Sequence, residues 1–121
     1  GKRIVNAAYE VHKELGPGLL EKVYESCIAQ VLREDKIVVV RQQLIPVNFK
    51  GKVYDDALRL DLLVDDLVIC EIKAAEAINP VWHAQILSHL KLTGKNLGYL
   101  INFNVPLIKQ GIKRFIFNHN K

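Results

Sequence analysis

The sequence predicts an α/β protein, specifically an α+β fold in which a mixed sheet is flanked by helices. Two helical patterns come first, and three segments rich in β-branched and aliphatic residues follow them. A third helical pattern then precedes one more short apolar segment. Helices and strands in this order are typical of a sheet with helices packed on it.

Two helices are expected at the start of the chain. Apolar residues recur at three- and four-residue steps from Ile4 to Leu15, and the "GPG" at 16–18 then ends the helix. The same spacing continues from about Leu19 to about Glu34 and predicts a second helix. Glu21 and Glu25 lie near its N-terminus, where the helix dipole favours negative charge, so either acid has a structural explanation.

The middle of the chain predicts an antiparallel meander. Its three strands are "KIVVVRQQLIPVNF", "KVYDDALRLDLLV" and "LVICEIKA", with Lys50-Gly51 between the first two and acidic turn residues between the last two. Pro80 precedes a helix in "VWHAQILSHLKLTG" that Gly94 ends. "NLGYLINF" predicts a short strand, and "VPLIKQGIKRFIF" fits either a helix or a strand.

Composition narrows the class of protein. A chain of 121 residues with 50% hydrophobic and 25% charged residues predicts a single domain over residues 1–121 and argues against disorder. No apolar run approaches the roughly 18 residues that cross a bilayer, and the first residues lack the apolar core of a signal peptide, so we expect a cytoplasmic protein. The net charge of +4 favours a polyanionic partner without requiring one.

Cysteines and histidines give no sign of a zinc site. Cys27 and Cys70 each lie inside an apolar pattern, which predicts two small buried apolar side chains and not a disulfide or metal pair. The histidines show no spacing of zinc ligands, and we expect surface or capping roles for them: His12, His83, His89 and His119.

Charged residues interrupt the second and third predicted strands. Glu71 and Lys73 share one face because they are two apart on a strand. A two-residue turn at Asp65-Asp66 would place Asp61 on the opposite face from Glu71. A three-residue loop at residues 65–67, or one bulge, would instead place the two acids opposite each other, with Cβ atoms about 5 Å apart. A shared site therefore predicts the longer loop or the bulge.

Two readings of these charges remain open on spacing alone. Facing carboxylates repel each other unless a positive charge lies between them, and a hard divalent cation with oxygen ligands would supply it. Lys73 would neutralise part of the charge. In the alternative reading, Asp61, Glu71 and Lys73 form an internal ion-pair network or lie on a solvated edge.

Five blocks in the sequence carry a resemblance to a known family. "GLLEKVY", with Gly18, Glu21 and Tyr24, is followed by "LDLLV", "ICEIKA", "HAQILSHLKLTG" and "LGYLINF". Together they resemble the GxxExxY protein family, a branch of the PD-(D/E)XK nuclease-like superfamily, over nearly the whole chain. The resemblance implies a restriction-endonuclease-like core with a central mixed β-sheet flanked by helices.

The resemblance also implies an active site. Asp61 matches the PD acid, Glu71-Ile72-Lys73 matches the (D/E)XK tripeptide, and Glu21 matches the helical acid. Asp61, Glu71 and the carbonyl of Ile72 would hold Mg²⁺ or Mn²⁺, and Glu21 would ligate a second metal ion. Lys73 would position the attacking water or offset charge that grows on the phosphate.

Substrate-contacting residues follow from the same resemblance. Gln85 matches the glutamine of a RecB-like QxxxY motif, whose tyrosine is His89 here, four residues further along one helical face. Tyr24 would contact substrate, orient Glu21 or pack on the sheet, and packing is the favoured role. Lys91 belongs to a basic group in the C-terminal third that would follow a phosphate backbone if it flanked the site.

The function implied is a divalent-metal-dependent nuclease that hydrolyses phosphodiester bonds in DNA, in DNA repair, recombination or mobile-element processing. A non-catalytic nucleic-acid-binding module on the same fold is the alternative. A regulatory interaction module is a third reading, with a homodimer formed through an exposed strand edge or the apolar tail.

Overall fold

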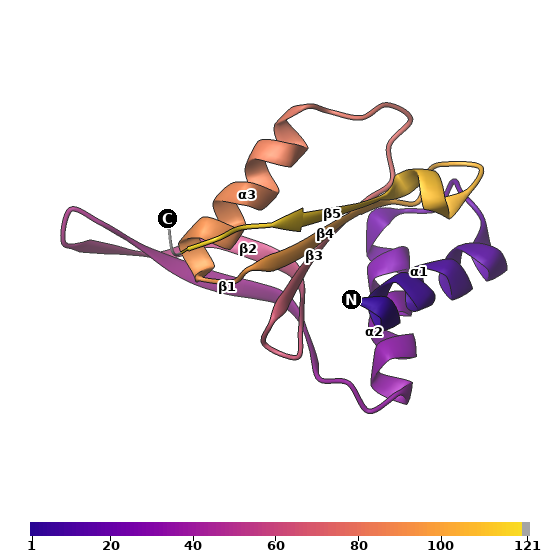
Figure 1. Cartoon of the computed structure of the whole chain (residues 1–121), viewed down its shortest axis with the longest axis horizontal. Helices are drawn as coiled ribbons and strands as arrows, with labels where there is room; N and C mark the ends of the chain where they lie inside the picture. The colour runs from indigo at the N-terminus through magenta and orange to yellow at the C-terminus, as the bar shows by residue number, and fades with distance from the viewer. Residues whose placement is uncertain (120–121) are drawn as a thin grey trace.

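The computed structural model describes residues 1–119 and has a five-stranded sheet with helices on both faces (Figure 1). This mixed sheet confirms the predicted fold class. The elements are α1 (Lys2–Leu15), α2 (Glu21–Glu34), β1 (Val39–Phe49), β2 (Lys52–Val64), β3 (Val68–Lys73), α3 (Val81–Thr93), β4 (Leu97–Asn102), η1 (Ile108–Gly111) and β5 (Ile112–Ile116).

Strand order in the sheet is β1-β2-β3-β4-β5. The first three strands form the predicted antiparallel meander, β3 and β4 are parallel, and β5 pairs antiparallel with β4. A parallel pair needs a long crossover connection, which α3 supplies here. The tail that fitted either a helix or a strand contains both, a 3₁₀ turn (η1) followed by β5.

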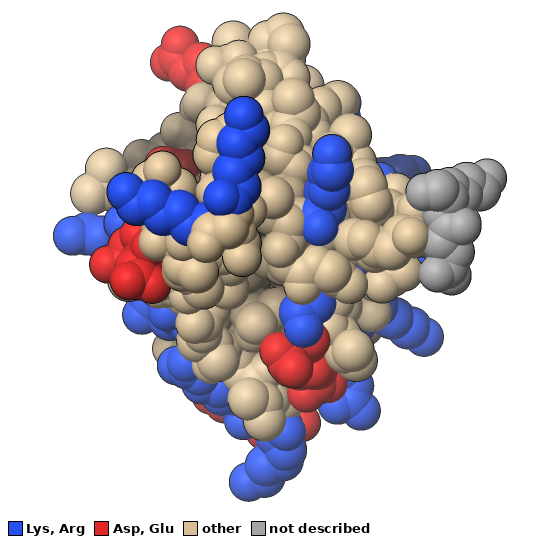
Figure 2. Space-filling view, turned by 90° about the vertical axis from the view of Figure 1, so that its left-hand side faces the viewer, with Lys and Arg blue, Asp and Glu red and all other residues tan. Residues whose placement is uncertain are grey.

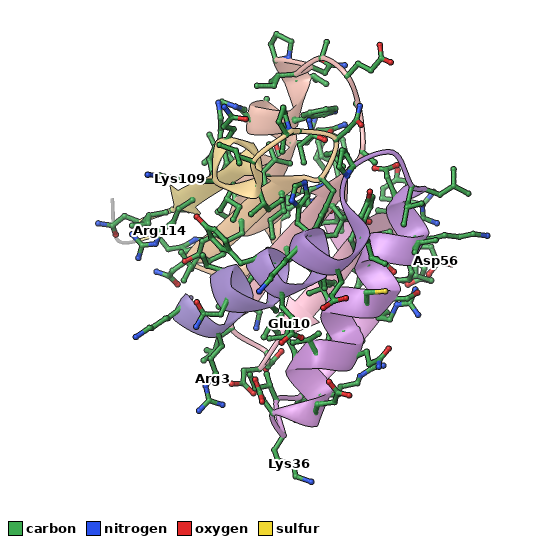
Figure 3. All side chains as sticks on the ribbon, turned by 90° about the vertical axis from the view of Figure 1, so that its right-hand side faces the viewer. Arg3, Glu10, Lys36, Asp56, Lys109 and Arg114 are labelled. Atoms are coloured by element: carbon green, nitrogen blue, oxygen red, sulfur yellow. The ribbon has the colours of Figure 1, made fainter. Side chains whose placement is uncertain are left out.

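Helices α1 and α2 lie side by side and cover one face of the sheet (Figure 3). Their apolar residues join those of β2, β3 and β4 in the larger of two buried clusters. Tyr24 of α2 is fully buried, and its ring stacks on Phe103 with the centroids 4.3 Å apart. Its hydroxyl donates to the carbonyl of Gly16 at 2.6 Å and accepts from the N–H of Leu19 at 3.0 Å. Tyr24 therefore has the favoured packing role and also fixes the loop between the two helices.

Helix α3 lies on the other face of the sheet (Figure 1). Leu90 on α3 packs in a second, smaller buried cluster with residues of β2 and β3. The backbone of β4 comes close to α3 at Gly98, where a Cβ atom would lie 3.0 Å from Cδ1 of Ile86 and 3.4 Å from the carbonyl oxygen of Ile69. Glycine at this position thus permits the close approach of α3. The helix ends at Gly94 in a left-handed conformation, as predicted.

A three-residue loop joins β2 to β3. Val64 pairs with Val68, and the N–H of Leu67 donates to the carbonyl of Val64 at 3.0 Å. Asp65 and Asp66 have positive φ angles of 54° and 56°, a conformation that aspartate tolerates better than most residues do. This is the longer of the two loops considered, and it sets the register that places Asp61 and Glu71 opposite each other.

The β1–β2 hairpin extends away from the rest of the molecule (Figure 1). Its strands pair closely up to a turn at Lys50-Gly51, where φ is 51° and 80°. The register shifts between Ile45 and Val47, around Pro46, which has no N–H to give to the ladder. Within residues 1–119, no helix combines the length and the apolar character needed to cross a membrane.

Cys70 is fully buried, as predicted, whereas Cys27 is only partly buried; both are free thiols. The prediction of surface or capping roles for the histidines was wrong for His12. His12 is buried with Nε2 2.9 Å from the carbonyl oxygen of Val105. His83 and His89 are half-buried, and His89 contacts an acid described below. His119 is the exposed one.

Candidate active site

Strands β2 and β3 separate just beyond their short paired segment. The ladder runs from Val64↔Val68 to Leu62↔Cys70, and the next step along the strands places Asp61 opposite Glu71. At that step Oδ2 of Asp61 accepts a hydrogen bond from the N–H of Ile72 at 2.9 Å. A side chain therefore takes the place that a backbone partner would have in a continuous ladder.

The carbonyl of Ile72 points toward the same gap. In a β-strand the N–H and C=O of one residue point to the same side, and the N–H of Ile72 points at Asp61. Two carboxylates and one carbonyl oxygen, from Asp61, Glu71 and Ile72, are thus directed to one region between the strands.

Glu71 is a buried acid, with 7% of its surface exposed. Its Oε1 lies 2.8 Å from Nδ1 of His89 on α3. Burial raises the pKa of Glu71 to about 7; the hydrogen bond with His89 opposes this rise, and the charge of Asp61 adds to it. A buried acid with so high a pKa gains from a nearby cation, because a cation favours the ionised form.

Lys73 is half-buried at the end of β3 and shares the strand face of Glu71. Its Nζ lies 5.4 Å from the centroid of the Trp82 ring, which belongs to the first turn of α3. A cation–π contact of this kind holds an ammonium group in place while leaving its N–H donors for another partner.

These groups lie in a cleft of about 430 Å³ between the sheet, α3 and the base of the β1–β2 hairpin. The cleft contains five of the predicted site residues: Asp61, Glu71, Lys73, Gln85 and His89. Its remaining lining includes residues that the sequence analysis did not assign to a site: Leu44, Asp56, Ala57, Leu58, Arg59, Trp82, Ile86 and Leu100.

The structure does not bring three predicted residues to the cleft. Glu21 is exposed in the first turn of α2 and Lys91 is exposed on α3, and neither lines the cleft. Tyr24 of α2, which the resemblance assigned to substrate contact, is fully buried in the core between the helices and the sheet, so no substrate reaches it.

Most of the other basic residues in the C-terminal third also lie away from the cleft. Lys109 and Arg114 lie on the opposite side of the molecule from Asp56, which lines the cleft (Figure 3). Lys113 does not line the cleft either; it lines a separate small pocket with Trp82 and Leu100.

Glu25 is the acid of α2 whose pKa is affected by Asp61 of the site, and the sequence analysis did not connect it with the site. It is 4% exposed; its Oε2 accepts from Arg41 at 3.0 Å and its Oε1 from Gln42 at 2.6 Å. Burial raises the pKa of Glu25, and the charge of Asp61 contributes to the rise. The helical spacing of the sequence could have revealed this: Glu25 lies on the buried apolar face of α2, beside Ile28, and a buried acid needs a hydrogen-bonding or charged partner.

The donor set suits a hard divalent cation. Carboxylate and carbonyl oxygens are the ligands that Mg²⁺ and Mn²⁺ prefer, and a cation would relieve the repulsion that helps raise the pKa of Glu71. Among residues 1–119, no three His, Cys, Asp or Glu side chains form a ready metal cluster. The carbonyl of Ile72 would therefore have to complete the set together with water.

Comparisons with known proteins agree with this fold. The crystal structure of SSO0001 is similar, with a TM-score of 0.50 and 20% sequence identity. That match covers 96% of this chain and 61% of the SSO0001 chain, and at this identity it shows a likeness of fold alone. No curated protein is significantly similar in sequence.

A family model gives the more specific result. The model described as the PD-(D/E)XK nuclease superfamily matches residues 1–115. Its coverage includes all three helices, all five strands down to Phe115, and every lining residue of the cleft. A match over nearly the whole length shows that this chain belongs to the PD-(D/E)XK nuclease superfamily.

Proposed function

We propose that this protein is a Mg²⁺- or Mn²⁺-dependent nuclease that hydrolyses phosphodiester bonds in DNA, in DNA repair, recombination or mobile-element processing. Membership of the superfamily supports a nuclease-type function and a nucleic acid substrate. The observation that carries the proposal is the meeting of Asp61 and Glu71 at the gap between β2 and β3, with Lys73 in the same cleft.

The cation would be held by the carboxylates of Asp61 and Glu71 and by the carbonyl of Ile72. When bound, it would polarise the scissile phosphate and lower the pKa of a bound water. His89 hydrogen-bonds Oε1 of Glu71 and would fix the orientation of that carboxylate. Glu21 takes no part in this proposal, because it is exposed and outside the cleft.

Two further side chains act on the substrate. The ammonium group of Lys73 would offset the negative charge that grows on the phosphate, and the ring of Trp82 keeps it beside the acids. Gln85 is exposed on α3 and lines the cleft, so its amide would bind a phosphate oxygen or a sugar hydroxyl.

Cleavage assays test the proposal directly. Wild type is incubated with single-stranded DNA, duplex DNA and RNA, each with Mg²⁺ and with Mn²⁺. We expect DNA cleavage that Asp61→Asn abolishes and that Lys73→Ala slows by roughly 100-fold or more. Lys22→Ala, an exposed lysine on α2, is the matched control and keeps full activity. Cleavage that survives Asp61→Asn, or no cleavage of any substrate by wild type, contradicts the proposal.

A non-catalytic nucleic-acid-binding module is the second candidate. The bond between His89 and Glu71 favours it, because that bond already satisfies one oxygen of the acid that a cation would need. This candidate predicts salt-sensitive binding without turnover, unchanged in Asp61→Asn. Calorimetric titration with Mn²⁺ separates the two, since only the nuclease predicts heat of binding that Asp61→Asn removes.

A further inference from the structure

The tip of the β1–β2 hairpin has exposed aromatic side chains. Phe49 is 59% exposed and Tyr54 is 46% exposed, although aromatic rings are usually covered when a fold can cover them. Figure 1 shows that the hairpin projects beyond the sheet and the helices. No element of the described chain packs over its end, so these two rings stay in solvent.

The two rings lie on the same face of the hairpin. Phe49 pairs with Lys52, and Val47 pairs with Tyr54. Cross-strand partners share a face, as do residues two apart on one strand, so all four side chains point to one side. Phe49 and Tyr54 are diagonal neighbours in this arrangement, at a spacing of about 7–8 Å between Cα atoms.

Each ring has a lysine beside it. Nζ of Lys50 lies 5.5 Å from the centroid of Phe49, and Nζ of Lys52 lies 5.1 Å from the centroid of Tyr54. The turn that carries Lys50 has two positive φ angles, and the N–H of Gly51 donates to Oδ1 of Asn48 at 3.1 Å. The tip therefore presents two aromatic rings and two ammonium groups on a defined turn.

The hairpin is continuous with the candidate active site. Leu44 on β1 and Ala57, Leu58 and Arg59 on β2 line the cleft, a few residues from the tip along the same two strands. A strand that leaves the cleft on this side would pass along the hairpin. The acids Asp55 and Asp56 lie between Arg59 and the tip, so the positive charge is at the two ends of this path.

The chemistry of the tip fits a single nucleic acid strand. Flat rings bind unpaired bases by stacking, and nearby lysines bind the phosphates. In a duplex the faces of the bases are covered by neighbouring base pairs, so only the lysines could contact it, through its phosphates. A second copy of this chain is less suited, because four lysines would meet at the contact between two tips. Figure 2 shows basic side chains spread over this side of the molecule, with acidic ones in separate clusters.

We propose that the tip of the β1–β2 hairpin is a binding arm for single-stranded DNA, on which Phe49 and Tyr54 stack unpaired bases of the strand that enters the cleft. This inference rests on the proposed nuclease function for its choice of DNA. It assigns to the hairpin a preference for substrates with an unpaired segment next to the cleavage site.

Binding measurements test the arm without relying on cleavage. Fluorescence anisotropy is followed in the absence of divalent metal with a labelled single strand of roughly 20 nucleotides, longer than the roughly 4–16 nucleotides that one small domain covers. We expect Phe49→Ala and Tyr54→Ala each to weaken binding by about 5- to 100-fold. Affinity for the same sequence as a duplex should change by less than about twofold.

Two controls keep the result specific. Tyr9 on α1 is 44% exposed, close to the value for Tyr54, so Tyr9→Ala is the matched variant and leaves binding unchanged. Tyr54→Phe keeps the ring and retains most of the affinity. Sedimentation of wild type and Phe49→Ala tests for a second copy: a dimer that dissociates in the variant, with unchanged binding of the single strand, overturns the proposal.

The arm and the nuclease function can fail separately. Unchanged single-strand affinity in Phe49→Ala and Tyr54→Ala overturns the arm, even if Asp61-dependent cleavage is observed. Loss of single-strand affinity in both variants supports the arm, even if wild type cleaves nothing. Equal losses for single-stranded and duplex DNA also overturn it, because stacking on unpaired bases would then not be the cause.

Discussion

The two faces of the sheet use burial differently. Under α1 and α2, fully buried side chains such as Ile28, Leu32 and Leu62 form a continuous apolar cluster. Under α3 the apolar cluster is smaller, the acid Glu71 is buried beside it, and Lys73 is only half covered. Burial of apolar side chains stabilises the fold on both faces, and on the second face burial also raises the pKa of Glu71 to about 7. The face under α1 and α2, the apolar face, thus carries the larger apolar cluster, whereas the cleft face under α3 combines a smaller one with the charged groups of the candidate site.

The largest expected effect is on the apolar face. Ile28→Ala removes a fully buried side chain and should lower the free energy of unfolding by about 2–5 kcal/mol. Lys73→Ala, on the cleft face, should change it by less than about 0.5 kcal/mol while removing most cleavage. Urea unfolding of both variants measures the contrast. A comparable loss of stability in Lys73→Ala would mean that Lys73 supports the fold as well as the candidate site.

The next effect depends on pH and comes from Glu71 on the cleft face. The pKa of Glu71 is about 7 in the folded protein, against an ordinary value of 4.5. Because the unfolded chain then releases its proton more readily, stability should fall as pH rises from about 4.5 to about 7. At about 1.4 kcal/mol for each unit of pKa difference, the loss is up to about 3 kcal/mol.

Glu71→Gln should show a smaller decline, because the raised pKa of Glu25 remains, and it should be more stable than wild type at about pH 8. Urea unfolding of both proteins across the range measures it, with Glu21→Gln as the control that follows wild type. Parallel stability curves for wild type and Glu71→Gln would show that Glu71 has no raised pKa.

The smallest effect compares the two acids of α2. Glu25→Gln weakens the pairing with Arg41 and should lower the free energy of unfolding by roughly 1–2 kcal/mol. Glu21→Gln replaces an exposed side chain and should change stability by less than about 0.5 kcal/mol. Thermal unfolding of the pair measures the difference. Equal effects would argue that the contacts of Glu25 with Arg41 and Gln42 do not stabilise the fold.

Periodicity and turn chemistry predicted most of the fold. Apolar spacing placed the helices, and the need for Asp61 and Glu71 to face one way selected the longer loop between β2 and β3. These features are local, so a single sequence contains them. The family resemblance matched Glu21 to the helical acid, whereas the turn of α2 exposes Glu21 and buries Glu25.

Features that depend on docking were not predictable. The contact between His89 and Glu71 joins residues 18 apart in sequence and depends on where α3 lies over the sheet. The placement of Trp82 over Lys73 depends on the same docking. The exposure of Phe49 and Tyr54 was also not predictable. Both are ordinary strand residues in the sequence, and only the structure shows that the hairpin projects into solvent (Figure 1).

The close approach of β4 and α3 at Gly98 has a consequence for the cleft. Trp82, Gln85, Ile86 and His89 are all on α3, so one helix carries one whole wall of the cleft. A Cβ atom at 98 would lie only 3.0 Å from Cδ1 of Ile86, so that Ile86, which lines the cleft, or α3 itself would have to shift. The position of one wall of the cleft therefore depends in part on a residue that has no side chain, and a larger residue at 98 would move Ile86 or α3 without replacing any residue that lines the cleft.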